Sequence, residues 1–150
     1  EHLTVPFEYS QDMGKVVAEH QGAHFYTIGQ RKGLHIGGRP EPSFVIGIDT
    51  DKNLVYSGQT DLHPGLNRIA LKIEKQDVHW LNLNYKINNG EDLPCFVRIR
   101  YRQKLKKATI IQEESGFYIL FDAKQKGITP GQFAAWYIGD ELIGSGVISS

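Results

Sequence analysis

The feature that most constrains the fold is an alternation of apolar and polar residues through the second half of the chain. From Asn67 onward, Ile69, Leu71 and Ile73 alternate with polar neighbours. The same period recurs in the segments 96–103, 108–112, 117–122, 133–138 and 142–148. Successive side chains of a β-strand point to opposite faces, so each segment is a strand candidate. About six short strands separated by turns predict a closed or nearly closed antiparallel six-stranded barrel over residues 67–150.

The first part of the chain has a different pattern, which predicts a small, mixed but mostly β domain over residues 1–66. Two strand candidates, 44–49 and 53–58, are separated by the hairpin-type turn 51–53. We expect a further short strand at 15–19. Thr27 and Gln30 have the spacing of a helix capping box, which predicts one helical turn there. Overall, the sequence predicts a mainly β protein of two domains.

Charge and composition exclude several broad classes of protein. The 17 basic and 17 acidic residues balance, which excludes a uniformly basic protein but allows a local basic patch. The sequence has no apolar run of transmembrane length and no signal segment, so we expect no membrane partner and a cytoplasmic location. The single cysteine, Cys95, fits a reducing compartment. The chain begins at Glu1 and its only Met is Met13, which favours a piece of a larger cytosolic protein.

The strongest physical signal is a row of basic residues at alternate positions of one predicted strand. These residues are Arg98, Arg100, Arg102 and Lys104. Period two predicts that they share an outward face, while Val97, Ile99 and Tyr101 point to the core. Lys106 and Lys107 extend the row, and residues 98–107 contain no acid. Such a local positive field suits a polyanion, because arginine matches the geometry of phosphate oxygens.

An alternative for this row is a solvated face that nearby carboxylates balance in space. The candidates for that role are Glu91, Asp92, Glu113 and Glu114. A second basic site is the run Gln30, Arg31 and Lys32 between two glycines, which let a backbone approach a ligand closely. It is interpreted either as a phosphate or partner contact or as a surface turn.

Residues that could carry catalysis form no convincing set. Among the six histidines, His20 and His24 are four residues apart, as in zincins, but Gly22 lies between them and no helix pattern supports them. No carboxylate or cysteine cluster completes a set, so we expect no metal site. Cys95 has no identifiable base nearby in sequence, so it is interpreted as a small core residue. The chain contains no phosphate-binding glycine loop and no nucleophile elbow. We therefore predict no catalytic residue and no cofactor within this chain.

Several motifs, taken together and in order, resemble one known family. They are residues 25–34 (FYTIGQRKGL), 55–59 (VYSGQ), 100–103 (RYRQ), 129–132 (TPGQ) and 144–148 (GSGVI), with His63, Trp80 and Cys95 between them. In this order they resemble the C-terminal portion of the bacterial-type tRNA-specific 2-thiouridylases, the tRNA-uridine 2-sulfurtransferases. The resemblance covers nearly all of residues 14–148.

The resemblance implies a particular division of labour. Members of the family have an ATP pyrophosphatase-type catalytic domain, a small central domain and a C-terminal barrel resembling the second domain of elongation factor Tu. The parent enzyme would use ATP with magnesium to activate the wobble uridine of tRNA, and would receive sulfur from a sulfur-relay donor protein. This chain lacks the family's Ser-Gly-Gly-x-Asp-Ser loop and both catalytic cysteines. The implied assignment is a non-catalytic piece, with the central domain at 1–66 and the barrel at 67–150.

The family's tRNA contacts map onto Arg100, Tyr101 and Gln132. Together with Arg98, Arg102 and Lys104 they form the predicted tRNA-docking site. For Gln30, Arg31 and Lys32, contact with tRNA and contact with the missing N-terminal catalytic domain both stay open. One alternative function is a protein-interaction barrel that packs on a catalytic domain without touching nucleic acid. Another is a freestanding enzyme with a small-molecule pocket.

Overall fold

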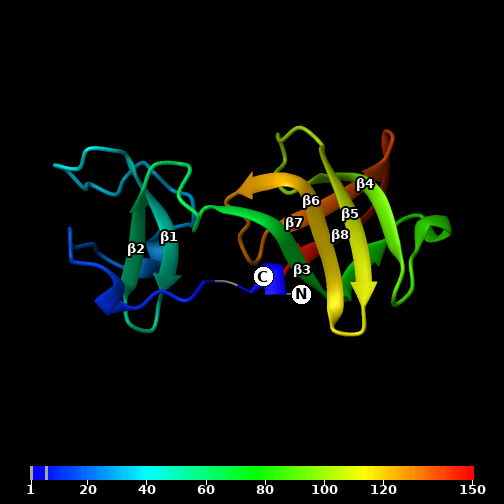
Figure 1. The fold of residues 1–150 in the computed structure, drawn as a ribbon, viewed down its shortest axis with the longest axis horizontal. Coiled ribbons are helices and arrows are strands. Elements are labelled where there is room, and N and C mark those ends of the chain that lie inside the picture. Colours follow the sequence, from blue (N-terminus) through cyan, green and yellow to red (C-terminus); the bar gives the residue numbers. More distant parts are fainter. Residues whose placement is uncertain (1, 6) are drawn as a thin grey trace. The chain divides into compact units, whose positions relative to one another are not determined.

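The computed structural model describes residues 2–5 and 7–150, which form two compact units. One unit contains residues 7–67 and is called the hairpin unit here. The other contains residues 2–5 together with 68–150 and is called the barrel unit. Both units are visible in Figure 1.

The hairpin unit is built on two antiparallel strands, β1 (Ser43–Asp49) and β2 (Leu54–Gln59). Asn53 ends the turn between them in the left-handed region, with φ of 54°, a conformation that Asn tolerates better than most residues. The buried side chains of this unit form a small core of Phe44, Ile46 and Leu66, against which Tyr9, Ile28 and Tyr56 pack. The predicted hairpin is therefore confirmed.

The segment before this hairpin contains only short 3-10 helices, which are η2 (Gln11–Met13) and η3 (Ala23–Phe25). The strand predicted at 15–19 is wrong, because the chain there has no regular structure. The helical turn predicted at Thr27 is also wrong. The Thr27 N–H does bond the Gln30 side chain, as in a capping box, but the Gln30 N–H bonds the Thr27 carbonyl in a tight turn. Gly29, with φ of 88°, turns the chain away from a helix.

The barrel unit is a closed antiparallel barrel of six strands, as the alternation predicted (Figure 1). Its strands are β3 (Asn67–Trp80), β4 (Asp92–Arg98), β5 (Lys106–Glu113), β6 (Gly116–Lys126), β7 (Phe133–Ile138) and β8 (Glu141–Ile148). Around the barrel the order is β3-β6-β5-β4-β7-β8. The unit also contains the 3-10 helices η1 (His2–Thr4) and η4 (Leu83–Tyr85). The predicted mainly β fold is confirmed.

The interior of the barrel holds one continuous apolar core. Trp136 on β7 is fully buried and stacks on Phe117 of β6, with ring centroids 4.9 Å apart. Trp80 packs edge-on against both rings. Gly144 on β8 faces Trp136, and a Cβ at Gly144 would lie 2.3 Å from the indole Nε1. The two tryptophans therefore serve as core residues.

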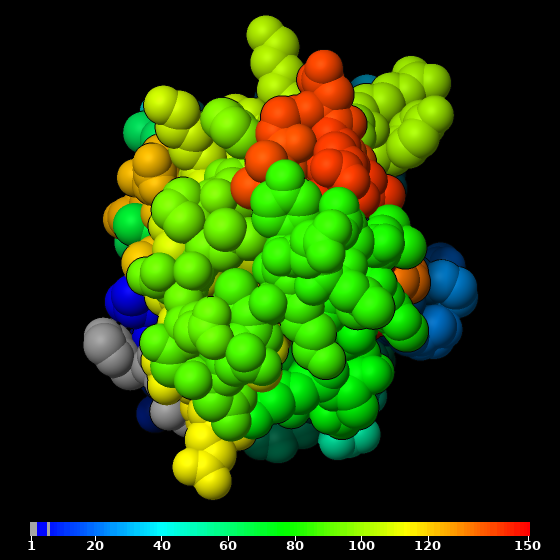
Figure 2. Space-filling model, turned by 90° about the vertical axis from the view of Figure 1, so that its right-hand side faces the viewer, coloured from blue at the N-terminus to red at the C-terminus, as the bar shows by residue number. Residues whose placement is uncertain are grey.

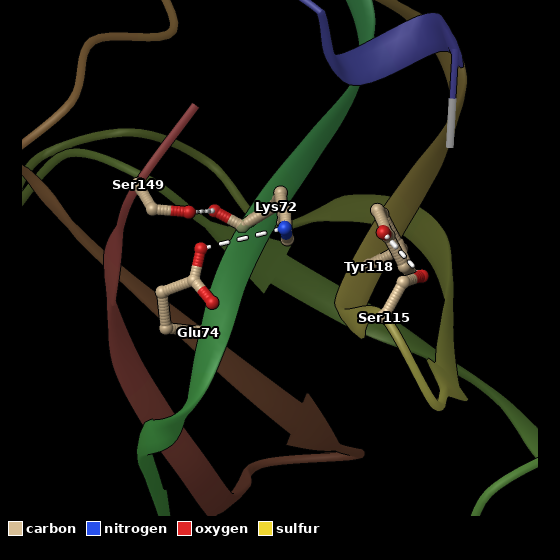
Figure 3. Close-up of polar contacts among 5 residues, drawn as sticks. All are labelled: Lys72, Glu74, Ser115, Tyr118 and Ser149. Atoms are coloured by element: carbon tan, nitrogen blue, oxygen red, sulfur yellow. Dashed lines mark hydrogen bonds and ion pairs between the residues drawn. The ribbon is translucent and has the colours of Figure 1, made fainter.

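The barrel closes where β3 meets β8 and the residues that follow β8. The Lys72 N–H donates to the Ser150 carbonyl at 2.8 Å, and the Ser149 N–H and hydroxyl both donate to the Lys72 carbonyl. Figure 3 shows this junction, with the ion pair between Lys72 and Glu74 (3.4 Å) beside it. The same view shows the hydrogen bond between Ser115 and Tyr118, which ties the β5–β6 turn to β6. Backbone pairing thus continues past the end of β8.

Because all neighbouring strands run antiparallel, the connections divide between two ends of the barrel. One end carries the connections 81–91, 114–115 and 139–140. Figure 2 shows the green 81–91 segment across this face, with the orange-red β7–β8 turn beside it. The other end carries the β4–β5 turn (99–105) and the β6–β7 loop (127–132). This second end, called the docking end here, contains most of the residues predicted to bind tRNA.

Candidate nucleic-acid interface

The predicted row of cations on one strand face is not what the structure shows. Strand β4 ends at Arg98, so Arg100, Arg102 and Lys104 lie in the β4–β5 turn. The inward orientations of Val97 and Ile99 are confirmed, because both are buried in the barrel core. The inward orientation of Tyr101 is wrong, because 88% of this residue is exposed.

Strand β4 ends at Arg98 because the next backbone N–H, that of Ile99, bonds the Gln103 side chain and not a neighbouring strand. The Ile99 N–H donates to Gln103 Oε1 at 2.9 Å, and the Gln103 N–H donates to the Arg100 carbonyl. Gln103 also bonds the side chain of Gln125 on β6. These bonds fold residues 99–103 into a turn, so the alternation of side chains stops there.

Arg98 fastens this turn to the wall of the barrel. Its Nη2 donates to the Tyr137 hydroxyl at 2.6 Å, and its Nη1 donates to the Tyr101 carbonyl at 3.3 Å. The guanidinium carbon lies 5.2 Å from the centre of the Tyr137 ring, within cation–π range. Both ends of the guanidinium are therefore engaged in holding the loop, which makes Arg98 a positioning residue of the docking end.

Arg100 joins the β4–β5 turn to the β6–β7 loop. Its Nη2 donates to the Gly127 carbonyl at 2.8 Å, and the Thr129 hydroxyl donates to the same oxygen. Gly127 has φ of 67°, and a Cβ at Gly127 would lie 2.4 Å from Arg100 Nη2. Glycine at this position thus gives the arginine room to reach the carbonyl. Arg100 is exposed, so its remaining guanidinium N–H groups are available to bind a ligand.

The other basic residues of the segment carry charge without a carboxylate partner. Within the ranges 2–5 and 7–150, no carboxylate oxygen lies within 4 Å of any of the six basic side chains between 98 and 107. Arg102, Lys104 and Lys107 are exposed, and Lys106 is half-buried. The alternative of a face neutralised by Glu91, Asp92, Glu113 or Glu114 is therefore not supported by close ion pairs in the described structure.

Gln132 lies in the loop that faces this turn. Its N–H donates to the Thr129 carbonyl, and its own carbonyl accepts from the Ile148 N–H. The side chain is half-buried, and its Oε1 has no hydrogen-bond partner among the described atoms. Because Arg100 bonds the carbonyl of Gly127 in the same loop, the structure brings Arg100, Tyr101 and Gln132 to the same end of the barrel.

Three residues of the docking end were not among the predicted site residues. They are Gly127, which accepts from Arg100, Tyr137, which holds Arg98, and Phe133, which is 65% exposed beside Gln132. Phe133 and Tyr137 take alternate positions of β7 with buried Ala134 and Trp136 between them. The alternation of β7 was available in the sequence and indicated that both rings face outward.

The second predicted site, at residues 30–32, belongs to the hairpin unit. The Gln30 side chain is used locally, since it accepts from the Thr27 N–H and donates to the Lys32 carbonyl. Arg31 and Lys32 are exposed. Arg31 lines a hollow of about 440 Å³ formed by residues 31–43, to which Arg39 and Glu41 also contribute. These residues belong to the hairpin unit, whereas those of the docking end belong to the barrel unit.

The side chains present offer little for covalent or metal chemistry. Cys95 is buried, and burial raises the pKa of its thiol from 9.0 to about 12, so the nucleophilic thiolate is scarce at neutral pH. In the described part of the chain, no three His, Cys, Asp or Glu side chains gather as a metal site would require. None of the helices that the structure describes is long and apolar enough to cross a membrane.

Comparisons with known proteins match both parts of the chain. Residues 71–148, more than half of the chain, match the profile of the aminomethyltransferase β-barrel domain, and residues 9–59 match that of the tRNA methyl transferase PRC-barrel domain. The tRNA-specific 2-thiouridylase MnmA of Flavobacterium johnsoniae is 52% identical over 141 residues. The proteins of the same name from Christiangramia forsetii and Karelsulcia muelleri are 52% and 46% identical. The chain belongs to the tRNA-specific 2-thiouridylase family.

Membership of the 2-thiouridylase family agrees with the resemblance found in the sequence motifs. The alignments cover 94%, 99% and 95% of this chain for the three relatives. They cover only 36%, 38% and 37% of the relatives' own lengths. The chain therefore spans little more than a third of the curated 2-thiouridylases that it matches.

Proposed function

We propose that this chain is the tRNA-docking portion of an ATP-dependent enzyme that thiolates the wobble uridine of tRNA. In this proposal residues 1–66 are the central domain and residues 67–150 the barrel domain. The parent enzyme consumes ATP with magnesium in the cytoplasm and takes sulfur from a relay protein. Those steps belong to an N-terminal catalytic domain outside residues 1–150. The buried, protonated Cys95 supports this assignment, since it is the only cysteine of the chain.

The observation that carries the docking role is the uncompensated positive charge at one end of the barrel. The basic side chains of residues 98–107 have no carboxylate within 4 Å in the described structure, and Gln132 lies in the adjoining loop. Phosphate oxygens are the natural partners of such a surface, and contacts of this kind position a nucleic acid without reading its sequence. We infer two roles for these side chains. Arg98 and Arg100 also hold the loops, whereas Arg102 and Lys104 are exposed and make no side-chain hydrogen bond or ion pair within the described residues.

The test is a titration of the chain with a tRNA that carries a wobble uridine, at two salt concentrations. Arg102→Glu with Lys104→Glu should weaken binding by about tenfold or more and make it less dependent on salt, because fewer counterions are released. The control pair, Lys75→Glu with Lys86→Glu, makes the same change of charge toward the opposite end of the barrel. Equal affinity of the docking-end variant and the wild-type chain would reject the docking end as the tRNA-binding surface.

A second proposal concerns the hairpin unit, which exposes several large apolar side chains. Phe7, Met13, Val16, Phe25 and Leu62 are between 60% and 88% exposed. Exposed apolar side chains mark a surface that packs on protein where they form a contiguous patch. We infer that this unit docks on the catalytic domain, with Arg31 and Lys32 at the contact. Co-purification with a separately expressed catalytic domain tests this, and loss of the complex in Phe25→Asp with retained tRNA binding is the expected result.

A further inference from the structure

Two exposed aromatic rings accompany the cations of the docking end. In the described residues 68–150, Tyr101 (88%) and Phe133 (65%) are the aromatic residues that are more than half exposed. Among the other described Phe, Tyr and Trp residues of the barrel unit, Phe96 is 36% exposed and the rest are buried or half-buried. Exposed aromatic area of this size is unfavourable in water unless a partner covers it. Their placement at one end indicates a common partner.

The backbone geometry brings both residues to the same end of the barrel. Arg98 pairs with Ala135 across β4 and β7, and Phe133 lies two residues before Ala135, on the same outward face. Arg98 also holds the carbonyl of Tyr101. Arg98 therefore holds the β4–β5 turn, which carries Tyr101, beside β7, which begins at Phe133.

The chemistry of this surface indicates which part of an RNA it fits. Cations without carboxylate partners attract phosphates of any RNA, paired or unpaired. Aromatic rings add affinity only where the face of a base is free, because stacked bases inside a duplex offer no face to a side chain. The combination of free cations and exposed rings is the one found where proteins bind single-stranded nucleic acid.

We propose that Tyr101 and Phe133 stack on unpaired nucleotides of the bound RNA. This inference rests on the proposed function, since it assumes that the docking end binds RNA. It adds that this end recognises a single-stranded region and that Phe133 is a binding residue. Arg102 and Lys104 then supply attraction to phosphates, and the two rings supply the preference for unpaired bases.

The experiment compares two RNAs with the same number of phosphates, a stem-loop with an unpaired loop and a blunt duplex. The stem-loop carries 2-aminopurine at single loop positions, so that stacking on a ring is seen as a change in fluorescence. We expect the wild-type chain to prefer the stem-loop. Phe133→Ala and Tyr101→Ala should each weaken stem-loop binding by about tenfold and leave duplex binding unchanged. Phe133→Trp should retain the preference.

Phe133→Leu separates stacking from general apolar contact, because it keeps an apolar side chain without a flat ring. We expect it to behave like Phe133→Ala. Normal stem-loop binding by the Leu variant, or equal losses on both RNAs, would overturn the inference while leaving RNA docking in place. If Arg102→Glu with Lys104→Glu weakens binding of both RNAs but Tyr101→Ala and Phe133→Ala change neither affinity, the proposed function is supported and the stacking role is rejected. If the wild-type chain binds neither RNA, both RNA docking and the stacking role are rejected.

Discussion

The contact between Arg100 and Gly127 yields a sharp prediction about how the docking end is held together. Gly127→Ala makes two changes at once. It places an alanine at φ of 67°, and it puts a Cβ 2.4 Å from Arg100 Nη2, so that the guanidinium must move. Gly139 is the matched control, because it has φ of 58°, an open surrounding and a place at the other end of the barrel. Its substitution by alanine makes only the first change.

The expected magnitudes follow from these two terms. Left-handed backbone costs an alanine about 1 kcal/mol relative to glycine, so Gly139→Ala should lower the free energy of unfolding by about that amount. Loss of the 2.8 Å bond from a partly exposed guanidinium to a carbonyl adds about 1 kcal/mol. Gly127→Ala should therefore lower the free energy of unfolding by about 2 kcal/mol.

Urea denaturation measures the free energy of unfolding of Gly127→Ala, of Arg100→Ala and of the variant that combines them. Together with the wild-type chain these three form a double-mutant cycle. In the Arg100→Ala background the bond is already absent, so Gly127→Ala should cost no more than Gly139→Ala does. The reasoning is refuted if Gly127→Ala and Gly139→Ala are equally destabilising in the wild-type background. It is also refuted if the extra loss persists without the Arg100 side chain.

Three further predictions concern the barrel. Cys95 should resist alkylation at neutral pH until the chain unfolds. Because folding raises the pKa of its thiol from 9.0 to about 12, the free energy of unfolding of the wild-type chain should fall relative to that of Cys95→Ala above pH 9, by about 1.4 kcal/mol per pH unit. A difference between the two chains that does not change with pH would contradict this. Gly144→Ala should lower the free energy of unfolding by about 1–3 kcal/mol, and with it the melting temperature, because the added Cβ overlaps the buried Trp136 indole. An unchanged melting temperature would show that the core has room for a methyl group there. Tyr137→Phe should lower the free energy of unfolding by about 1 kcal/mol and speed amide hydrogen exchange in the 99–105 turn, because Arg98 loses its hydroxyl acceptor but keeps the ring. Unaltered exchange would show that Arg98 does not position the turn.

The architecture of the barrel was predictable because it depends on a repeated local signal. Inward positions such as Val97, Ile99 and Trp136 are apolar, and their neighbours face water, so the alternation indicated the strands and the closed sheet. The motifs between residues 25 and 148 were likewise sufficient for the family when they were taken together, because they are strings of particular residues in a fixed order. Both kinds of signal are contained in a short stretch of chain.

The docking end was predicted only in part. The sequence indicated that residues 98–107 carry concentrated positive charge, and it indicated Gln132 through the family resemblance. It placed the cations on one continuous strand, because the pattern of Arg98, Ile99 and Arg100 carries straight on past the true end of β4. The location of that end depends on Gln103, whose side chain takes the Ile99 N–H, and no period in the sequence records that bond.

The sequence by itself therefore determined the fold class, the family and the kinds of side chain at the docking end. Only the tertiary structure decided which of them hold the loops, that Tyr101 faces outward, and that the β4–β5 turn lies against the loop that precedes Phe133. The physical reason is the range of the interactions. Strand alternation and turn chemistry act between neighbours in the chain, whereas the bonds of Arg98 to Tyr137 and of Arg100 to Gly127 join residues 39 and 27 positions apart. Such bonds exist only after the barrel has closed.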